Sequence, residues 1–176
     1  MASKKKNIKK KNTKNSSANR NTLISFFLII TGVFFISTIF SADYDNYIGV
    51  LGGAFLYIFK GFFGNVLILF SLSLIFIGVY RLINKEKVRI SFYYALVLIN
   101  ISMFMIFQIN YIEKLSFQSL QEAFLLQKGG GIIGAFFGDI IYYSFGIVGY
   151  WLVFLALLII GTVLLVNEIT ALSRIK

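Results

Sequence analysis

The sequence lacks the residues on which most catalytic and metal-binding sites depend. It contains no cysteine and no histidine, so disulfides are excluded, and zinc sites and acid–base catalysis lose their usual ligand and base. Proline is also absent, so any break within a helix must come from glycine or from polar residues. No stretch matches a phosphate-binding loop, a dinucleotide-binding turn or a zinc-protease helix. We therefore expect no cofactor, no metal and no catalytic centre.

Charged residues are scarce as well, at 14% of the chain, whereas hydrophobic residues make up 58%. The mean hydropathy is +0.82, far above that of an ordinary soluble domain. A soluble protein of 176 residues could not cover so much apolar surface, so lipid must act as its solvent. The composition predicts an all-α integral membrane protein.

The basic residues are concentrated in the first 21 residues, which contain eight Lys and Arg and no acid. Interleaved Asn and Ser predict that residues 1–21 form a disordered tail, whose charge would attract anionic lipid. A cleaved signal peptide is the rival interpretation. It is disfavoured because the apolar segment Thr22–Phe40 is long enough to span the bilayer and no small-residue cleavage site follows it.

Two later apolar blocks are too long for single crossings. Gly131–Val166 contains one charge, Asp139, and would be about 54 Å long as a straight helix, against a hydrocarbon core of about 30 Å. A break is expected between Asp139 and Gly146, and another near Lys60 in the block Ile48–Tyr80. The expected crossings are 22–40, 65–80, 91–110 and 147–166, with interfacial or re-entrant helices at 47–59, 112–127 and 131–145, a membrane domain over 22–167 and a polar exit at 168–176.

Charge placement predicts the orientation of these four crossings. With the N-terminus in the cytoplasm, the tail, the loop Arg81–Arg89 and the C-terminal end hold 14 of the 17 basic residues on that side. The three remaining lysines lie on the other side with five of the seven acids. This asymmetry follows the positive-inside rule and predicts that both termini are cytoplasmic.

The two long blocks share a glycine pattern. Three glycines recur at an offset of 82 residues: Gly49, Gly52 and Gly64 as Gly131, Gly134 and Gly146. The pattern predicts two parallel hairpin repeats, each with a crossing, an exterior loop, a glycine-rich surface helix and a second crossing. Coincidence within glycine-rich apolar sequence is the alternative.

Small residues also form ridges in these blocks. Gly130, Gly134 and Gly138 are spaced by four residues, and Gly49 and Gly53 form a weaker version. Such ridges allow close approach of helix backbones in lipid. Packing between subunits and packing within one subunit explain them equally well.

Four polar side chains lie within or beside the apolar segments. Asp139 is a functional-site candidate by default, but it has no buried ionisable partner on the expected crossings, so a hydrated interfacial position is favoured. Lys60 is expected at the water boundary, because a lysine at the bilayer centre costs about 2.5–3.5 kcal/mol. Asn100 and Gln108 are expected to bond across helices.

The sequence resembles a known family. The first span ends in SADYD and is followed by NYIGVLGGAFLYIFKGFFG, and the later stretch GGGIIGAFFGDIIYYSFGIVGYWLVFLALLIIG repeats the glycine pattern. These features resemble the N-terminal four-helix membrane region of the FtsK/SpoIIIE DNA translocases over Thr22–Asn167. Members of that family anchor at the division septum of the bacterial inner membrane and carry a C-terminal hexameric ATPase that pumps double-stranded DNA. The present sequence contains no Walker A loop, no motor and no DNA-reading domain.

The resemblance implies a non-enzymatic anchor and assembly domain that forms homo-oligomers, contacts division-site membrane proteins and reaches DNA only through a motor absent from these residues. Two other classes stay open. One is a small transporter or channel built from two parallel repeats, which would need polar residues converging within the bilayer. The other is an adaptor that recruits partners through the amphipathic segment Tyr111–Lys128.

Overall fold

The computed structural model describes residues 20–37, 39, 49–84, 88–112 and 116–173. The expected tail and the acidic turn SADYDNY fall largely outside these residues. Every regular element in the described residues is helical. They comprise a first helix at Arg20–Ser37, α2 at Gly49–Phe63, η1 at Gly64–Val66, α3 at Leu67–Ile83, α4 at Ile90–Gln108, η2 at Ile109–Tyr111, α5 at Phe117–Leu126 and α6 at Gly131–Ser173.

Four helical stretches are long and apolar enough to cross a membrane: Arg20–Ser37, Gly49–Ile83, Ile90–Tyr111 and Gly131–Ala171. The expected all-helical fold with four membrane-spanning helices is confirmed. Between 17% and 33% of each span is buried within the chain, so most of its apolar surface faces outward. Such exposure suits a protein that uses lipid as its solvent.

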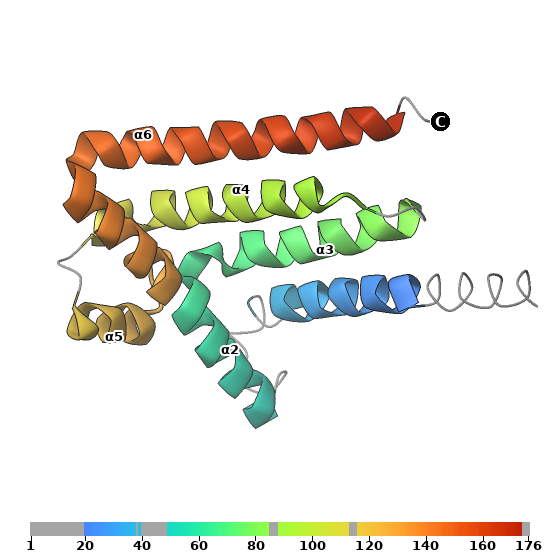
Figure 1. The fold of residues 1–176 in the computed structure, drawn as a ribbon. Coiled ribbons are helices and arrows are strands. Elements are labelled where there is room, and N and C mark those ends of the chain that lie inside the picture. The colour runs from blue at the N-terminus through green and yellow to red at the C-terminus, as the bar shows by residue number, and fades with distance from the viewer. Residues whose placement is uncertain (1–19, 38, 40–48, 85–87, 113–115, 174–176) are drawn as a thin grey trace, which may run out of the picture.

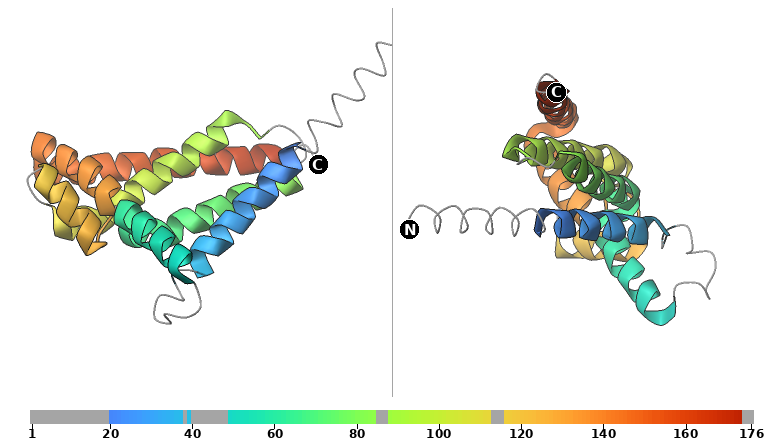
Figure 2. Two further views of the ribbon diagram at one scale, coloured as in Figure 1. Left: turned by 90° about the horizontal axis from the view of Figure 1, so that it is seen from below. Right: turned by 90° about the vertical axis from the view of Figure 1, so that its right-hand side faces the viewer.

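The helices form two groups. The first helix, α3, α4 and the later part of α6 are long rods, whereas α2, α5 and the beginning of α6 gather at one end (Figure 1). The start of the first helix and the end of α6 lie at the opposite end of the bundle (Figures 1 and 2). An even number of spans brings both ends of the described chain to that end.

Glycine breaks both long apolar blocks. Gly146 has φ 67° and ψ −173°, which divides α6 into a short segment, Gly131–Phe145, and a long segment, Ile147–Ser173. This position lies within the interval where the sequence predicts a break. Gly64 has φ 56° and separates α2 from α3 through the turn η1. Both conformations favour glycine because a side chain would be strained there.

Several helix ends differ from the expected ones. The first helix already includes Arg20 and Asn21, which the sequence assigned to the disordered tail. The last helix continues through the expected polar exit to Ser173. Intramolecular contacts explain both extensions, because Asn21 accepts a hydrogen bond from Arg81, and Glu168 accepts one from Ser91. Tertiary bonds of this kind hold helix ends that apolar periodicity does not predict.

Small residues let the crossings pack closely in pairs. A Cβ added at Gly78 of α3 would lie 2.8 Å from the Ser25 carbonyl oxygen of the first helix. A Cβ added at Gly161 of α6 would lie 3.1 Å from the Ala95 carbonyl oxygen of α4. Among the labelled elements, α4 and α6 share the most extensive helix–helix contact. The absence of side chains at both positions allows the close approach that stabilises helices in lipid.

Candidate functional site: a glycine junction at one end of the bundle

The two long apolar blocks meet where their backbones cross. A Cβ added at Gly64 would lie 2.4 Å from the Gly129 carbonyl oxygen, and one added at Gly131 would lie 2.5 Å from that of Phe62. The Asn65 amide donates a hydrogen bond of 2.9 Å to the Gly129 carbonyl. Only glycine permits this approach, because the nearest atoms belong to backbone that cannot rotate away. We call this crossing the glycine junction, comprising Gly61, Gly64, Gly129, Gly130 and Gly131.

The helix α5 closes one side of the glycine junction. A Cβ added at Gly61 would lie 2.4 Å from the ring of Phe124 on α5. The same ring meets Tyr57 and Phe62 of α2 edge-on, at centroid distances of 5.5 and 5.9 Å. A capping box at Ser116 satisfies backbone amides at the start of α5. Aromatic packing therefore fixes this short helix against α2.

The ridge Gly130, Gly134 and Gly138 packs within the chain. All three glycines are buried, and a Cβ at Gly134 or Gly138 would touch Gln108 of α4 at 3.2 or 2.9 Å. The Gln108 side chain accepts a 3.1 Å hydrogen bond from the Gly130 amide and donates one of 3.1 Å to the Tyr111 carbonyl. Of the two interpretations left open by the sequence, packing within one subunit describes this ridge.

The weaker ridge behaves differently. Gly49 and Gly53 are exposed, and an added Cβ at either would meet no atom of the described residues within 4 Å. Their neighbour Gly52 is buried, whereas Val50 and Leu51 are 91% and 78% exposed. The first turns of α2 therefore present small and apolar residues outward.

The sequence predicts a hydrated interfacial position for Asp139, and this prediction is wrong because the protein encloses the side chain. It is 1% exposed. It lines a cavity of about 40 Å³ between α4, α5 and α6, with polar lining residues Gln108, Tyr111, Ser119, Glu122 and Lys128. A cavity of this size and polarity is large enough for a buried water. The local sequence could not reveal this burial, because the covering residues come from α4 and α5.

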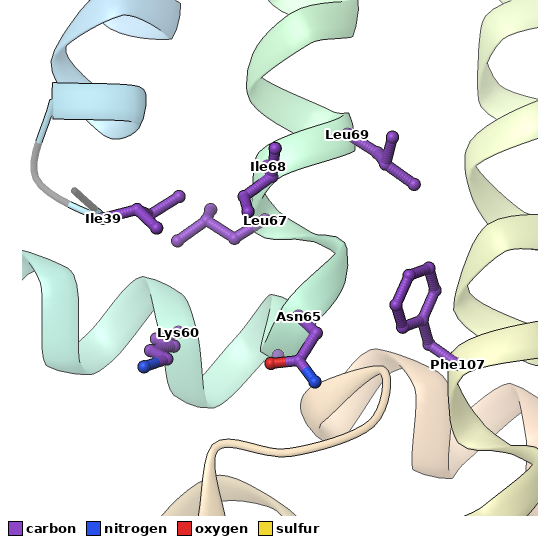
Figure 3. Close-up of a pocket in the computed structure, with 8 residues that line it drawn as sticks. Ile39, Lys60, Asn65, Leu67, Ile68, Leu69 and Phe107 are labelled. Atoms are coloured by element: carbon purple, nitrogen blue, oxygen red, sulfur yellow. The ribbon is translucent and has the colours of Figure 1, made fainter.

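The two expected interhelical amides occupy different places. Asn100 of α4 donates hydrogen bonds to the Ser73 hydroxyl of α3 at 3.0 Å and to the Leu96 carbonyl at 2.8 Å. Gln108 bonds the Gly130 amide, as described above. The expected bond across helices is present for Asn100, whereas Gln108 bonds the turn that precedes α6. Lys60 is half-buried at the rim of a groove of about 430 Å³ (Figure 3).

Polar contacts at the other end of the bundle escaped prediction. Arg81 donates a hydrogen bond of 2.9 Å to the Tyr93 hydroxyl and one of 3.2 Å to the Asn21 side-chain oxygen. Glu168 accepts a hydrogen bond from Ser91, and its carboxylate lies 3.9 Å from the Arg89 guanidinium. One sequence feature pointed to the contacts of Glu168: it is the only acid near the C-terminal end.

Taken together, the glycine junction positions helices and does not assemble reactive groups. Within the described ranges, no three His, Cys, Asp or Glu side chains come close enough to hold a metal ion. Tyr150 is fully buried, and its hydroxyl donates a hydrogen bond to the Met105 carbonyl oxygen. These contacts stabilise a fixed arrangement of α4, α5 and α6.

The comparisons with known proteins give one match. The family model described as the 4TM region of DNA translocase FtsK/SpoIIIE matches residues 21–172. A search of curated proteins and a search of solved structures found no significant match.

Proposed function

Because the chain belongs to the family of the 4TM region of the DNA translocases FtsK/SpoIIIE, we propose that it anchors such a translocase at the division septum. It is a multi-pass membrane protein with four spans. The observation that supports the proposal is the shared end of the bundle at which the first helix begins and α6 ends (Figure 1). A motor joined after α6 would lie on the same side as the start of the first helix.

The proposed orientation places that shared end in the cytoplasm of a bacterial cell. Arg81 and Arg89 lie at this end among the described residues, whereas α2 and α5 lie at the other. The positive-inside rule then assigns α5 and the glycine junction to the exterior of the inner membrane. DNA would be reached only through a motor on the cytoplasmic side.

The absence of native cysteine makes the orientation directly testable. Single variants Ser3→Cys and Gln118→Cys need no background substitutions, because the chain contains no cysteine of its own. We expect a membrane-impermeant maleimide to label Gln118→Cys on intact spheroplasts and to label Ser3→Cys only after lysis. The reverse pattern would overturn the orientation and, with it, the placement of a motor.

We also propose that the membrane domain is a duplicated hairpin. Paired glycines 82 residues apart share positive φ: Gly49 (63°) with Gly131 (61°), and Gly64 (56°) with Gly146 (67°). Gly78 and Gly161, near the ends of the two blocks, each pack against the preceding crossing. Positive φ at matching positions supports duplication over coincidence.

Assembly into homo-oligomers is proposed through α2. The ridge at Gly130–Gly138 is occupied by α4, whereas no described residue covers the face containing Gly49 and Gly53. Crosslinking in membranes tests this assignment, because a bulky residue at Gly53 should change the crosslinked species without unfolding the chain. Division-site membrane proteins are proposed to contact the exterior helix α5, whose Leu125 and Leu126 are 55% and 58% exposed.

The septal role has a separate test. We expect a fluorescent fusion of the full chain to concentrate at division sites in dividing cells that lack the native family member. Uniform fluorescence around the cell membrane would contradict septal anchoring while leaving the membrane fold intact.

A further inference from the structure

A groove beside the Gly64 bend combines an apolar lining with a cationic rim. Its volume is about 430 Å³, within the usual range for ligand pockets. Figure 3 shows Lys60 and Asn65 along one side, with Ile39 and Ile68 above them and Phe107 on the neighbouring helix α4. The complete lining is Ile39, Lys60, Gly64, Asn65, Leu67, Ile68, Leu69 and Phe107.

The bend creates the groove by separating two consecutive helices. Positive φ at Gly64 turns the chain from α2 into α3, and the hydrogen bond from the Asn65 amide to the Gly129 carbonyl holds the turn in place. Lys60 in the last turn of α2 and Asn65 in η1 therefore lie at the same side of the groove. The apolar wall comes from α3 and α4, whose Ile68 and Phe107 are 39% and 37% exposed.

The cationic rim is not neutralised by the described part of the chain. Lys60 has no carboxylate within salt-bridge distance among the described residues, whereas Arg89 does have one. The Asn65 side chain is exposed and makes no hydrogen bond within the same residues. One ammonium and one amide are thus available to an acceptor-rich group at the mouth of an apolar groove.

We propose that this groove binds an anionic phospholipid. One acyl chain lies against Ile68, Leu69 and Phe107, and the phosphate accepts hydrogen bonds from the Lys60 ammonium and the Asn65 side-chain amide. Lipid is favoured over a peptide because the groove opens on the apolar outer surface of a membrane-spanning bundle. Basic pockets between transmembrane helices bind acidic head groups by the same physics. The proposal is independent of the translocase role and of the orientation in the membrane.

The test measures which lipids stay bound to the purified full chain. The protein is reconstituted in nanodiscs of phosphatidylcholine with phosphatidylglycerol, released gently, and examined by native mass spectrometry. We expect preferential retention of phosphatidylglycerol. Lys60→Gln should lower the retained ratio of phosphatidylglycerol to phosphatidylcholine about fivefold, the effect of one lysine near a membrane surface.

Two further variants separate head-group binding from acyl-chain binding. Lys128→Gln removes an equal charge from the loop before α6 and should leave the lipid ratio unchanged. Ile68→Trp fills the groove and should reduce retention of both lipids, because the acyl chain loses its site. Size-exclusion chromatography and circular dichroism verify that each variant stays folded.

Three results would overturn the proposal. The first is equal retention of the two lipids by the wild type. The second is the same lipid ratio in Lys60→Gln as in the wild type. The third is preferential retention of phosphatidylglycerol by the double variant Asp43→Asn, Asp45→Asn but not by the wild type. Acids of the chain itself, and not a lipid phosphate, would then be the partners of Lys60.

Discussion

The helix α2 and the short segment of α6, Gly131–Phe145, have the same length of 15 residues but different surroundings. Each begins at a glycine with positive φ and is followed by another. The glycine ridge of the α6 segment packs on α4, whereas no part of the described chain lies within 4 Å of a Cβ added at Gly49 or Gly53. The same local pattern thus serves internal packing in one half and leaves a free face in the other.

The glycines that follow these two helices differ in the same way. Gly64 is buried at the glycine junction, and its nearest neighbours are backbone atoms. Gly146 is exposed, and an added Cβ there would meet nothing within 4 Å. Conformation alone requires glycine at Gly146, whereas conformation and space both require it at Gly64. Substitutions at the two positions separate these two costs.

Gly64→Ala has the largest expected effect. Backbone strain combines with overlap of the new Cβ and the Gly129 carbonyl oxygen, 2.4 Å away. We expect the free energy of unfolding to fall by about 3 to 5 kcal/mol. Denaturant titration in mixed micelles measures this loss. A loss no larger than that of Gly146→Ala would show that the glycine junction relaxes to admit a methyl group.

Gly134→Leu tests the internal ridge. Its Cβ would lie 3.2 Å from both the Gln108 side-chain oxygen and the Phe104 carbonyl, so a larger side chain must push α6 away from α4. We expect a loss of about 2 to 3 kcal/mol, measured in the same titration. Unchanged stability together with altered crosslinking would instead assign this ridge to contacts between subunits.

Gly146→Ala isolates the conformational cost. The substitution adds no steric overlap, so only the backbone strain at φ 67° and ψ −173° remains. We expect a loss of about 1 to 2 kcal/mol. If α6 instead straightens at this position with no loss of stability, the distance between spin labels on its two segments would change.

Gly53→Leu has the smallest expected effect on stability. The position is exposed and open, so the free energy of unfolding should change by less than about 0.5 kcal/mol. Crosslinking in membranes should nevertheless reveal altered oligomers if the free face of α2 joins subunits. Wild-type crosslinking patterns would contradict that role and leave the face to lipid or to another protein.

The sequence predicted the parts of this fold that depend on composition and local pattern. Apolar blocks of excessive length predicted breaks, and the recurrence of Gly64 as Gly146 indicated where the chain turns. The bends lie at these glycines because no proline is present to break a helix. Such signals need only the composition and the spacing of residues along the chain.

The remaining features depend on residues far apart in the chain. Burial of Asp139 requires α4 and α5 to cover it, and the Glu168–Ser91 hydrogen bond joins residues 77 positions apart. Asn21 and Arg81 are 60 positions apart. No periodicity within a single helix encodes such pairs, so the cavity and the polar contacts at the bundle end could not be predicted.

The uninterrupted helix from Ile147 to Ser173 has a mechanical consequence. Its 27 residues extend about 40 Å, and its backbone hydrogen bonds run along the axis. Tension applied at its C-terminal end would pass first through Glu168 and Ser91, and then to Tyr150 beneath the Gly146 bend. Hydrogen bonds thus hold this helix to α4 near both of its ends. A force along the helix would be distributed over both helices.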